Sequence, residues 1–406
     1  MEVIGGIILL VILYVVSMPF LQALKKKNPW FKIKLMQGMY WWHALFCTVY
    51  YIFALSNPSD SVGYFNRPQT NYDDWFSAYD TGTHFIDFVA YPFINYFHFS
   101  YEMMMVLFSW LGYWGFVYFY IFFKENTRYK HYWQGIDIIS ILIFLPNMHY
   151  WTASLGKGSI IFFGIGLSIY GLSRMNKRKI ALAMGLLTIY LVRPHVFLFM
   201  AVGIVVGLFT GRQKIPAYQK LLVFGGSIAA LFLLYDQIME FANIDGDNIL
   251  ESFSQFSDHR AVELAKAGSG LDTSNYPLIL KLFTFWFRPL FIDAPGPVGL
   301  IVSFENLFYL ILTMKLFQSG FFRFLRTGTA LVKTSAVIFL ATSFALSGAL
   351  SNLGIIIRQK SMVMYFFLFV ILSFMDYKKN LRVVKKQQKE DLEKKPSPAT
   401  PVPIPN

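Results

Sequence analysis

The chain has 406 residues, of which 55% are hydrophobic and only 15% are charged, and its formal net charge is +13. Charged residues make up about a quarter of an ordinary soluble domain, so this composition excludes a soluble protein of this size. The basic residues lie between apolar segments rather than on one polar domain, which argues against nucleic acid as a partner. The single cysteine, Cys47, excludes an intrachain disulfide and a cysteine-based metal site.

The apolar segments predict about eleven transmembrane helices, because a helix needs about 20 apolar residues to cross a hydrocarbon core. Glu2 precedes the first segment and Lys25 to Lys27 follow it. This charge order is opposite to that of a cleavable signal peptide, so we expect a retained helix with its N-terminus outside. The predicted helices span residues 3–24, 36–56, 100–123, 135–150, 159–173, 179–193, 195–211, 220–240, 298–318, 332–350 and 361–377.

The charges of the connections predict the orientation of this all-α, polytopic membrane protein. With the N-terminus outside, the cytoplasmic connections are 25–34, 124–130, 174–179, 212–220, 323–333 and the tail from 378, and each is rich in Lys or Arg. Residues 1–377 then form a single multi-pass membrane domain, and the charged, proline-rich segment 378–406 is expected to be a disordered cytoplasmic tail. Two long outside loops, 57–99 and 241–297, mix polar residues with apolar patches, which favours interfacial or re-entrant helices that roof a cavity.

The basic residues of the outer face are few, and they lie where a helix re-enters the membrane. They are Lys157 in LGKGS, Arg193 in VRPH, Arg288 in WFRPL, and Arg358 with Lys360 in IIIRQK. A helix N-terminus is already positive, so a cation there is unfavourable unless an anion binds between them. The arginine fork suits phosphate oxygens. The pattern predicts a phosphate or diphosphate site, although each arginine alone could instead reach lipid headgroups or pair with an acid.

Several carboxylates on the same face are candidate general bases, since activation of a sugar hydroxyl needs a proton acceptor beside it. For a loop acid, simple solvation is the competing explanation. Glu305 differs, because it lies about two turns into an apolar helix, where a carboxylate needs a partner. The candidates in the first loop are Asp60, Asp73, Asp74, Asp80 and Asp87, and those near the ninth helix are Asp293 and Glu305.

Four histidines, His84, His98, His149 and His195, also map to the outer face or its boundary. No HxH or HExxH spacing occurs, so we expect no metal site. His149 in PNMHYW and His195 in RPH lie close to the basic residues. They are candidates for proton transfer, and packing within an aromatic belt is the alternative.

An N-outside helix followed by KKK, a second helix, and the loop DSVGYFN…NYDDWFSAYDTGTHFI resembles the start of the EpsG-like and Wzy-like, or O-antigen type, polysaccharide polymerases. The later segments FLPNMHYWTASLGKGSIIFFGIGLSIYGL, LVRPH and NLGIIIRQKSMVMYFF are similar to that group as well. The resemblance implies a multi-pass enzyme that joins lipid-diphosphate-linked oligosaccharides outside the cytoplasmic membrane. It further implies that Arg193 and Arg358 hold the diphosphate of a polyprenyl carrier, while an acid of the first loop helps to activate the acceptor hydroxyl.

We therefore expect a metal-independent glycosyltransferase of exopolysaccharide or surface-glycan synthesis, in the cytoplasmic (inner) membrane with an extracytoplasmic active face and without a cofactor. The expected partners are the polyprenyl-diphosphate-linked oligosaccharide, the bilayer and, as further candidates, other membrane proteins of glycan assembly. Two alternatives stay open. One is a C-type glycosyltransferase that uses a polyprenyl-phosphate sugar donor, and the other is a flippase or transporter of lipid-linked glycans.

Overall fold

The computed structural model describes residues 2–212, 216–242, 276–294, 296–349 and 352–393. These residues form helices, apart from loops and one short antiparallel hairpin of β1 (Tyr132–Trp133) and β2 (Ile136–Asp137). The longer helices are α1 (Glu2–Lys27), α2 (Ile33–Ser56), α3 (Asp60–Thr70), α5 (Tyr101–Asn126), α8 (Lys157–Ser173), α9 (Lys179–Val192), α10 (Pro194–Thr210), α11 (Ala217–Ala242), α13 (Leu278–Phe287), α14 (Gly296–Thr313), α16 (Ala330–Ala349) and α18 (Met364–Glu393). The shorter ones are α4 (Phe85–Tyr91), α6 (Ile138–Leu142), α7 (Pro146–Thr152), α15 (Phe321–Arg326) and α17 (Leu353–Gln359), with single turns η1 (Phe76–Ala78), η2 (Pro92–Tyr96), η3 (Met314–Phe317) and η4 (Lys360–Met362).

Among the described residues, four helical segments are long and apolar enough to cross a membrane: α1, α5, α14 with η3, and α16. Two bent pairs, α7 with α8 and α17 with α18, raise the number to six if each pair is one span. The helices α9, α10 and α13 are apolar but shorter. The expectation of an all-α, multi-pass membrane protein is confirmed at this level, whereas the number of eleven crossings and their direction stay predictions.

Two predicted segments take a different form in the structure. The expected helix 135–150 is divided into β2, α6 and α7, because Pro146 begins a new helix and Leu145 before it is extended. A proline lacks the N–H that a continuous helix needs, and it disfavours the helical conformation of the preceding residue. The tail is the second case, since α18 continues to Glu393 and residues 378–393 are therefore helical rather than irregular. Residues 394–406 lie outside the described part of the chain.

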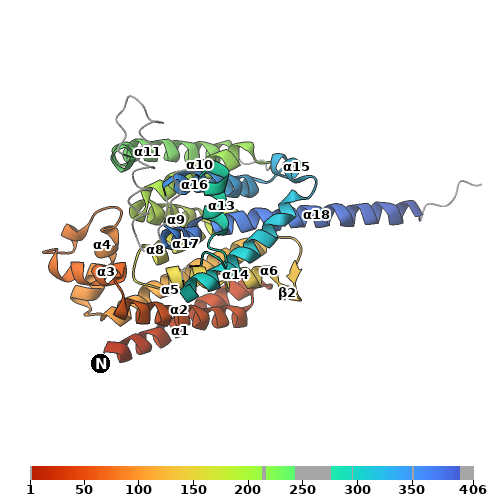
Figure 1. The fold of residues 1–406 in the computed structure, drawn as a ribbon. Helices are drawn as coiled ribbons and strands as arrows, with labels where there is room; N and C mark the ends of the chain where they lie inside the picture. The colour runs from red at the N-terminus through yellow and green to blue at the C-terminus, as the bar shows by residue number, and fades with distance from the viewer. Residues whose placement is uncertain (1, 213–215, 243–275, 295, 350–351, 394–406) are drawn as a thin grey trace, which may run out of the picture.

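The helices run roughly along one direction, so that the molecule has two distinct ends (Figure 1). One end carries α3 and α4, and the other carries β2, α15 and the extended part of α18. Polar contacts join several basic connections and the residues beside them at this second end. These contacts are Arg178 with Glu125, Gln219 with Asn176, Arg212 N with Gly328 O, Lys378 with Ser319 O, and His131 with Asp376.

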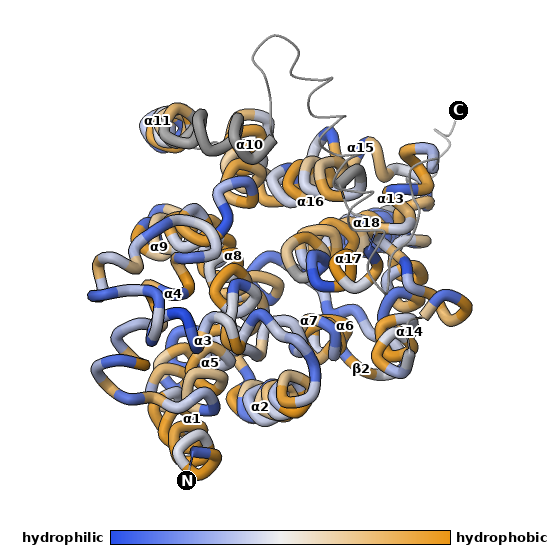
Figure 2. Tube along the Cα trace, turned by 60° about the vertical axis from the view of Figure 1, so that its left-hand side comes forward, coloured by the Kyte–Doolittle hydropathy of each residue, from blue (hydrophilic) through white to orange (hydrophobic). Residues whose placement is uncertain are grey.

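The helical body has α5 near its centre, packed against α1, α2 and α8, while α8 also packs against α9. A second group is built on α16, which contacts α10, α13 and α18. The contact between α10 and α16 depends on Gly207, because a Cβ at this position would lie 1.9 Å from Thr334 Oγ1 and 2.6 Å from Ala330 O. In a view turned so that the side with α3 and α4 comes forward, the helices are mostly orange and the loops around α3 and α4 mostly blue (Figure 2).

The first long loop, residues 57–99, folds into α3, η1, α4 and η2, and we call this segment the cap. The expected short helices of this loop are thus present. Of the second long loop, the structure describes α13 and its C-terminal connection, while residues 243–275 lie outside the described part of the chain.

Candidate functional site

A pocket lies where the cap meets the ends of several helices, and we call it the cationic pocket. It contains about 630 Å³ of unfilled space, a volume that includes open solvent. Its described lining is Tyr50, Asp60, Tyr64, Trp151, Ser154, Leu155, Gly156, Lys157, Gly158, Ile161, Arg193, Arg358, Gln359 and Met362. Four residues singled out from the sequence therefore converge here: Asp60, Lys157, Arg193 and Arg358.

Lys157 is the first residue of α8, so the N-terminus of this helix lies at the pocket. No side chain caps it, and the backbone N–H groups of its first turn add to the positive charge of the lysine. The neighbouring Gly158 is required by packing, because a Cβ there would lie 2.1 Å from Trp151 O. The sequence GKG therefore brings the start of α8 directly against the end of α7.

Arg193 supplies the second cation from the joint between α9 and α10. The helix α10 starts at Pro194 directly after Arg193, again without a side-chain cap. The Arg193 Nη1 group donates to Gln359 Oε1 at 2.6 Å, which links the α9–α10 joint to the end of α17. Gln359 carries no charge, so this contact orients the guanidinium without neutralising it.

Arg358 approaches from α17 and forms an ion pair with Asp60, with 3.1 Å between Nη1 and Oδ2. The side chains are 37% and 67% exposed, so water screens this pair. Asp60 is the one carboxylate among the described residues that line the pocket, against three cations. The pocket is thus electropositive, and its charges come from separate helices.

Aromatic side chains form the remaining walls. Tyr50 packs against Trp151 with ring centroids 6.3 Å apart, and the Arg358 guanidinium lies 6.0 Å from the Trp151 ring. The indole Nε1 of Trp151 is buried and finds no hydrogen-bond acceptor among the described residues. Burial, and after it the negative charge of Asp60, raises the pKa of Tyr64 to about 12, so its hydroxyl remains a neutral donor near pH 7.

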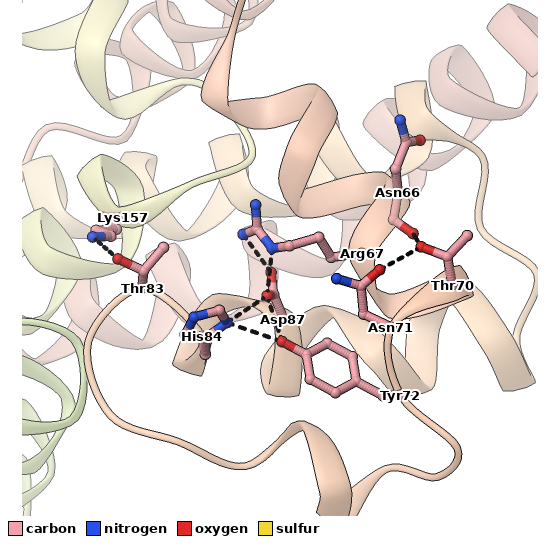
Figure 3. Close-up of polar contacts among 9 residues, drawn as sticks. All are labelled: Asn66, Arg67, Thr70, Asn71, Tyr72, Thr83, His84, Asp87 and Lys157. Carbon is pink, nitrogen blue, oxygen red and sulfur yellow. Dashed lines mark hydrogen bonds and ion pairs between the residues drawn. The ribbon is translucent and has the colours of Figure 1, made fainter.

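The cap is held together by a buried carboxylate (Figure 3). Asp87 is fully buried, and it accepts hydrogen bonds from Arg67 Nε at 2.7 Å, from Arg67 Nη2 at 2.8 Å and from Tyr72 at 2.9 Å. His84 Nδ1 lies 3.3 Å from the same carboxylate. The bond to Asp87 is the main reason why the pKa of Arg67 is raised, and burial followed by this carboxylate raises the pKa of Tyr72 to about 12.

Two contacts fasten the cap beside the cationic pocket. Lys157 Nζ donates to Thr83 Oγ1 at 2.5 Å, as Figure 3 also shows. The backbone N–H of Gly82 donates to the carbonyl of Leu191 at 2.8 Å, two residues before Arg193. Together with the ion pair between Asp60 and Arg358, these contacts join the cap to the elements that carry all three pocket cations.

Two other predicted residues, Glu305 and Lys360, lie in a separate buried cluster, with the predicted Arg288 and Asp293 at its edge. Glu305 accepts from the backbone N–H of Asn147 at 2.5 Å, with Tyr309 OH at 3.3 Å. Lys360 is fully buried and donates to Arg288 O at 2.7 Å and to Asn306 Oδ1 at 2.8 Å. The side chain of Arg288 itself pairs with Asp293. These residues hold α7, α14, η4 and the loop after α13 together, and the structure does not place them in the lining of the cationic pocket.

The predicted histidines are also not among the pocket-lining residues. His149 is buried, lies 2.8 Å from His43 between the two Nδ1 atoms, and stacks on Phe116 with centroids 3.9 Å apart. Packing, the alternative left open for it, accounts for this position. His195 is the second residue of α10.

The acids of the first loop separate in space. Asp74 forms a local turn, since its carboxylate accepts from the N–H of Ser77 at 2.8 Å. Asp73 and Asp80 are exposed on the cap, and Asp87 is committed to Arg67. Only Asp60 of this group lines the pocket. In the described residues, no three His, Cys, Asp or Glu side chains gather as a metal site requires.

Sequence reasoning did not single out Gln359, Tyr50 or Tyr64. Gln359 follows Arg358 directly, and its contact with Arg193 depends on a pairing between segments 166 residues apart. The tyrosines belong to a chain with 24 of them, so their type alone carries no signal. Comparisons of the chain with protein-family models, curated proteins and solved structures found no match.

Proposed function

We propose that this chain is a membrane glycan polymerase, a glycosyltransferase that joins polyprenyl-diphosphate-linked oligosaccharide units on the extracytoplasmic side of the membrane. One observation carries the proposal: Lys157, Arg193 and Arg358 converge from different helices on a single open pocket. Two of them stand at uncapped N-termini of long helices. Such an arrangement suits a diphosphate, because the anion offsets both the like charges and the helix dipoles.

In the proposed reaction, an acceptor hydroxyl oxygen attacks the anomeric carbon of the donor sugar. The bond from that carbon to the diphosphate oxygen breaks, and the diphosphate leaves with the electron pair. The three cations stabilise its growing negative charge. Asp60, the carboxylate beside Arg358, takes the proton of the acceptor hydroxyl. The aromatic rings of Tyr50, Tyr64 and Trp151 offer faces for sugar rings, and the Trp151 N–H offers a donor.

The proposed orientation places the cap and the cationic pocket outside, and the basic connections in the cytoplasm. It is supported by the arrangement of the ends, because the cap and the basic connections lie at opposite ends of the helical body (Figure 1). Lys and Arg accumulate on the cytoplasmic side of membrane proteins. A carrier lipid bound with its headgroup at the pocket would then remain in the outer leaflet.

The test compares the glycans made by cells that carry Arg193→Ala, Arg358→Ala or the control Arg326→Ala as the only copy. Arg326 is an exposed arginine of α15, at the end away from the pocket. At equal protein levels, we expect the two pocket variants to lose long glycan chains and the control to keep its length ladder. An unchanged ladder in both pocket variants would refute the proposal.

A second assay uses the purified protein in detergent with a lipid-diphosphate-linked oligosaccharide. Products of increasing length support a polymerase. A single addition from a polyprenyl-phosphate donor would identify a C-type transferase instead. Absence of any product, while the protein still moves the lipid between leaflets of vesicles, would identify a transporter, because detergent removes the two compartments that transport requires.

A further inference from the structure

A second charged cavity lies at the opposite end of the molecule, and we call it the basic groove. It is lined by His131, Lys315, Gln318, Phe374, Met375, Lys378, Lys379, Arg382, Val383 and Lys386. Its unfilled space is about 1100 Å³, including the part open to solvent. Five of these residues are lysine or arginine, and none of the described lining residues is an acid. None of them belongs to the cationic pocket.

One face of α18 builds most of this groove. Residues 375, 378, 379, 382, 383 and 386 follow the spacing i, i+3, i+4, i+7, i+8 and i+11, which places them on a single side of the helix. On the other wall, Lys315 and Gln318 come from η3 and the residue after it. The helical extension of α18 thus presents its cations toward a second element rather than dispersing them in solvent.

Within the described part of the chain, Lys386 is the one groove cation that pairs with an acid. The nearby Asp376 is engaged elsewhere, since it accepts from His131 Nε2 at 2.7 Å and from the backbone N–H of Tyr129 at 3.2 Å. Lys378 donates to Ser319 O at 3.1 Å and Lys379 to Lys130 O at 3.3 Å, and both acceptors are neutral carbonyls. Lys386 has only an exposed pair with Glu390 at 3.7 Å, of a kind that contributes little.

The position of the groove along α18 identifies the kind of anion. The apolar run MYFFLFVILSFM ends at Met375, and the basic face starts three residues later with Lys378. Phe374, at the end of this run, is fully buried, and together with Met375 it gives the groove an apolar floor. Cations above an apolar floor, at the level where a hydrophobic helix leaves the bilayer, match a phospholipid: phosphate toward the cations and carbon chains toward the membrane.

We propose that the basic groove binds an anionic phospholipid of the leaflet on this side, with Lys315, Arg382 and Lys386 around its headgroup. This site is independent of the proposed glycan polymerase activity, and it concerns the opposite end of the protein. The lipid offsets the repulsion among the five cations. It thereby fastens the extension of α18 against η3.

The experiment measures phosphatidylglycerol bound to the detergent-purified full chain by native mass spectrometry during a lipid titration. The test variant is Arg382→Gln with Lys386→Gln, and the control is Lys385→Gln with Lys389→Gln, which removes the same charge from α18 outside the groove lining. Each cation near an anionic lipid surface contributes on the order of 1 kcal/mol. We expect the test variant to bind about thirtyfold more weakly, and the control to bind as the wild type does.

Equal weakening in the test and control variants would overturn the site, because it would reflect net charge alone. Lys315→Gln changes the wall opposite α18 and should weaken binding of phosphatidylglycerol about fivefold. An unchanged affinity in this variant counts against the proposed groove, even if the α18 variant fails to fold. Inorganic phosphate and phosphatidylcholine are compared with phosphatidylglycerol as further ligands of the wild type. If either raises the melting temperature of the wild type as much as phosphatidylglycerol does, the ligand is not an anionic phospholipid.

Discussion

Replacing Arg67 by methionine should loosen the cap, because it leaves the carboxylate of Asp87 buried without its cation. Removing one partner of a buried ion pair typically costs about 3–5 kcal/mol. The Arg67 side chain is 28% exposed, and Tyr72 would still donate at 2.9 Å, so we expect about 2–3 kcal/mol here. This is a roughly 30- to 150-fold increase in the equilibrium for opening of the cap.

The appropriate assay is hydrogen–deuterium exchange of peptides from residues 60–96, followed by mass spectrometry. Asp87→Asn is the matched variant, since an amide keeps the shape and leaves a partly solvated arginine, for a loss of about 1 kcal/mol. The double variant should exchange more slowly than Arg67→Met alone, because it contains no unpaired buried charge. The reasoning is refuted if Arg67→Met exchanges no faster than Asp87→Asn, or if the double variant is the fastest.

Two further predictions concern the helical body. Gly207→Ala should lower the melting temperature in detergent, since the added Cβ would overlap α16 at a cost of about 1–3 kcal/mol. The control Gly225→Ala has open space at its site and should not lower it. Equal effects of the two variants would contradict the packing described. For the orientation, the buried Cys47 should not react with a membrane-impermeant maleimide on intact cells. In the otherwise unchanged chain, a cysteine introduced by Asp80→Cys should be labelled on intact cells, and one introduced by Lys385→Cys only after lysis. The reverse pattern would show that the topology is inverted.

Two of the three pocket cations could be predicted because they conflict with their local environment. The expectation of a helix start is wrong for Arg358, which lies in the last turn of α17, where the helix dipole favours a cation. Lys157 and Arg193 stand at helix starts, where the dipole disfavours a cation, and this conflict is visible in a single sequence. Lys360 shows the limit of that argument. Side chains two residues apart are rotated by about 200° around a helix axis, so they point to nearly opposite sides. Arg358 therefore reaches the pocket, while Lys360 turns into the buried cluster. Applying the helical period to IIIRQK would have separated the two.

Other features depend on pairings that sequence spacing does not reveal. Asp87 and Arg67 meet only because the turn around η1 reverses the chain between α3 and α4, so the choice among the aspartates of the first loop could not be made from the sequence. The broken segment 135–150 is different, since Pro146 is a visible signal for a helix start. The apolar composition of the segment favours one continuous helix, and the proline overrides it.

The short lengths of α9 and α10 have a consequence for the surrounding lipid. With 14 and 17 residues, these helices rise about 21 and 26 Å, less than a hydrocarbon core of about 30 Å. If both helices cross the membrane, as the sequence predicts, local thinning of the bilayer is one way to match their length, and it would bring the lipid phosphates closer to the joint at Arg193. Hydrophobic mismatch would then deliver a carrier headgroup to the arginine while its chain stays in the membrane, and activity should depend on the acyl-chain length of the host bilayer.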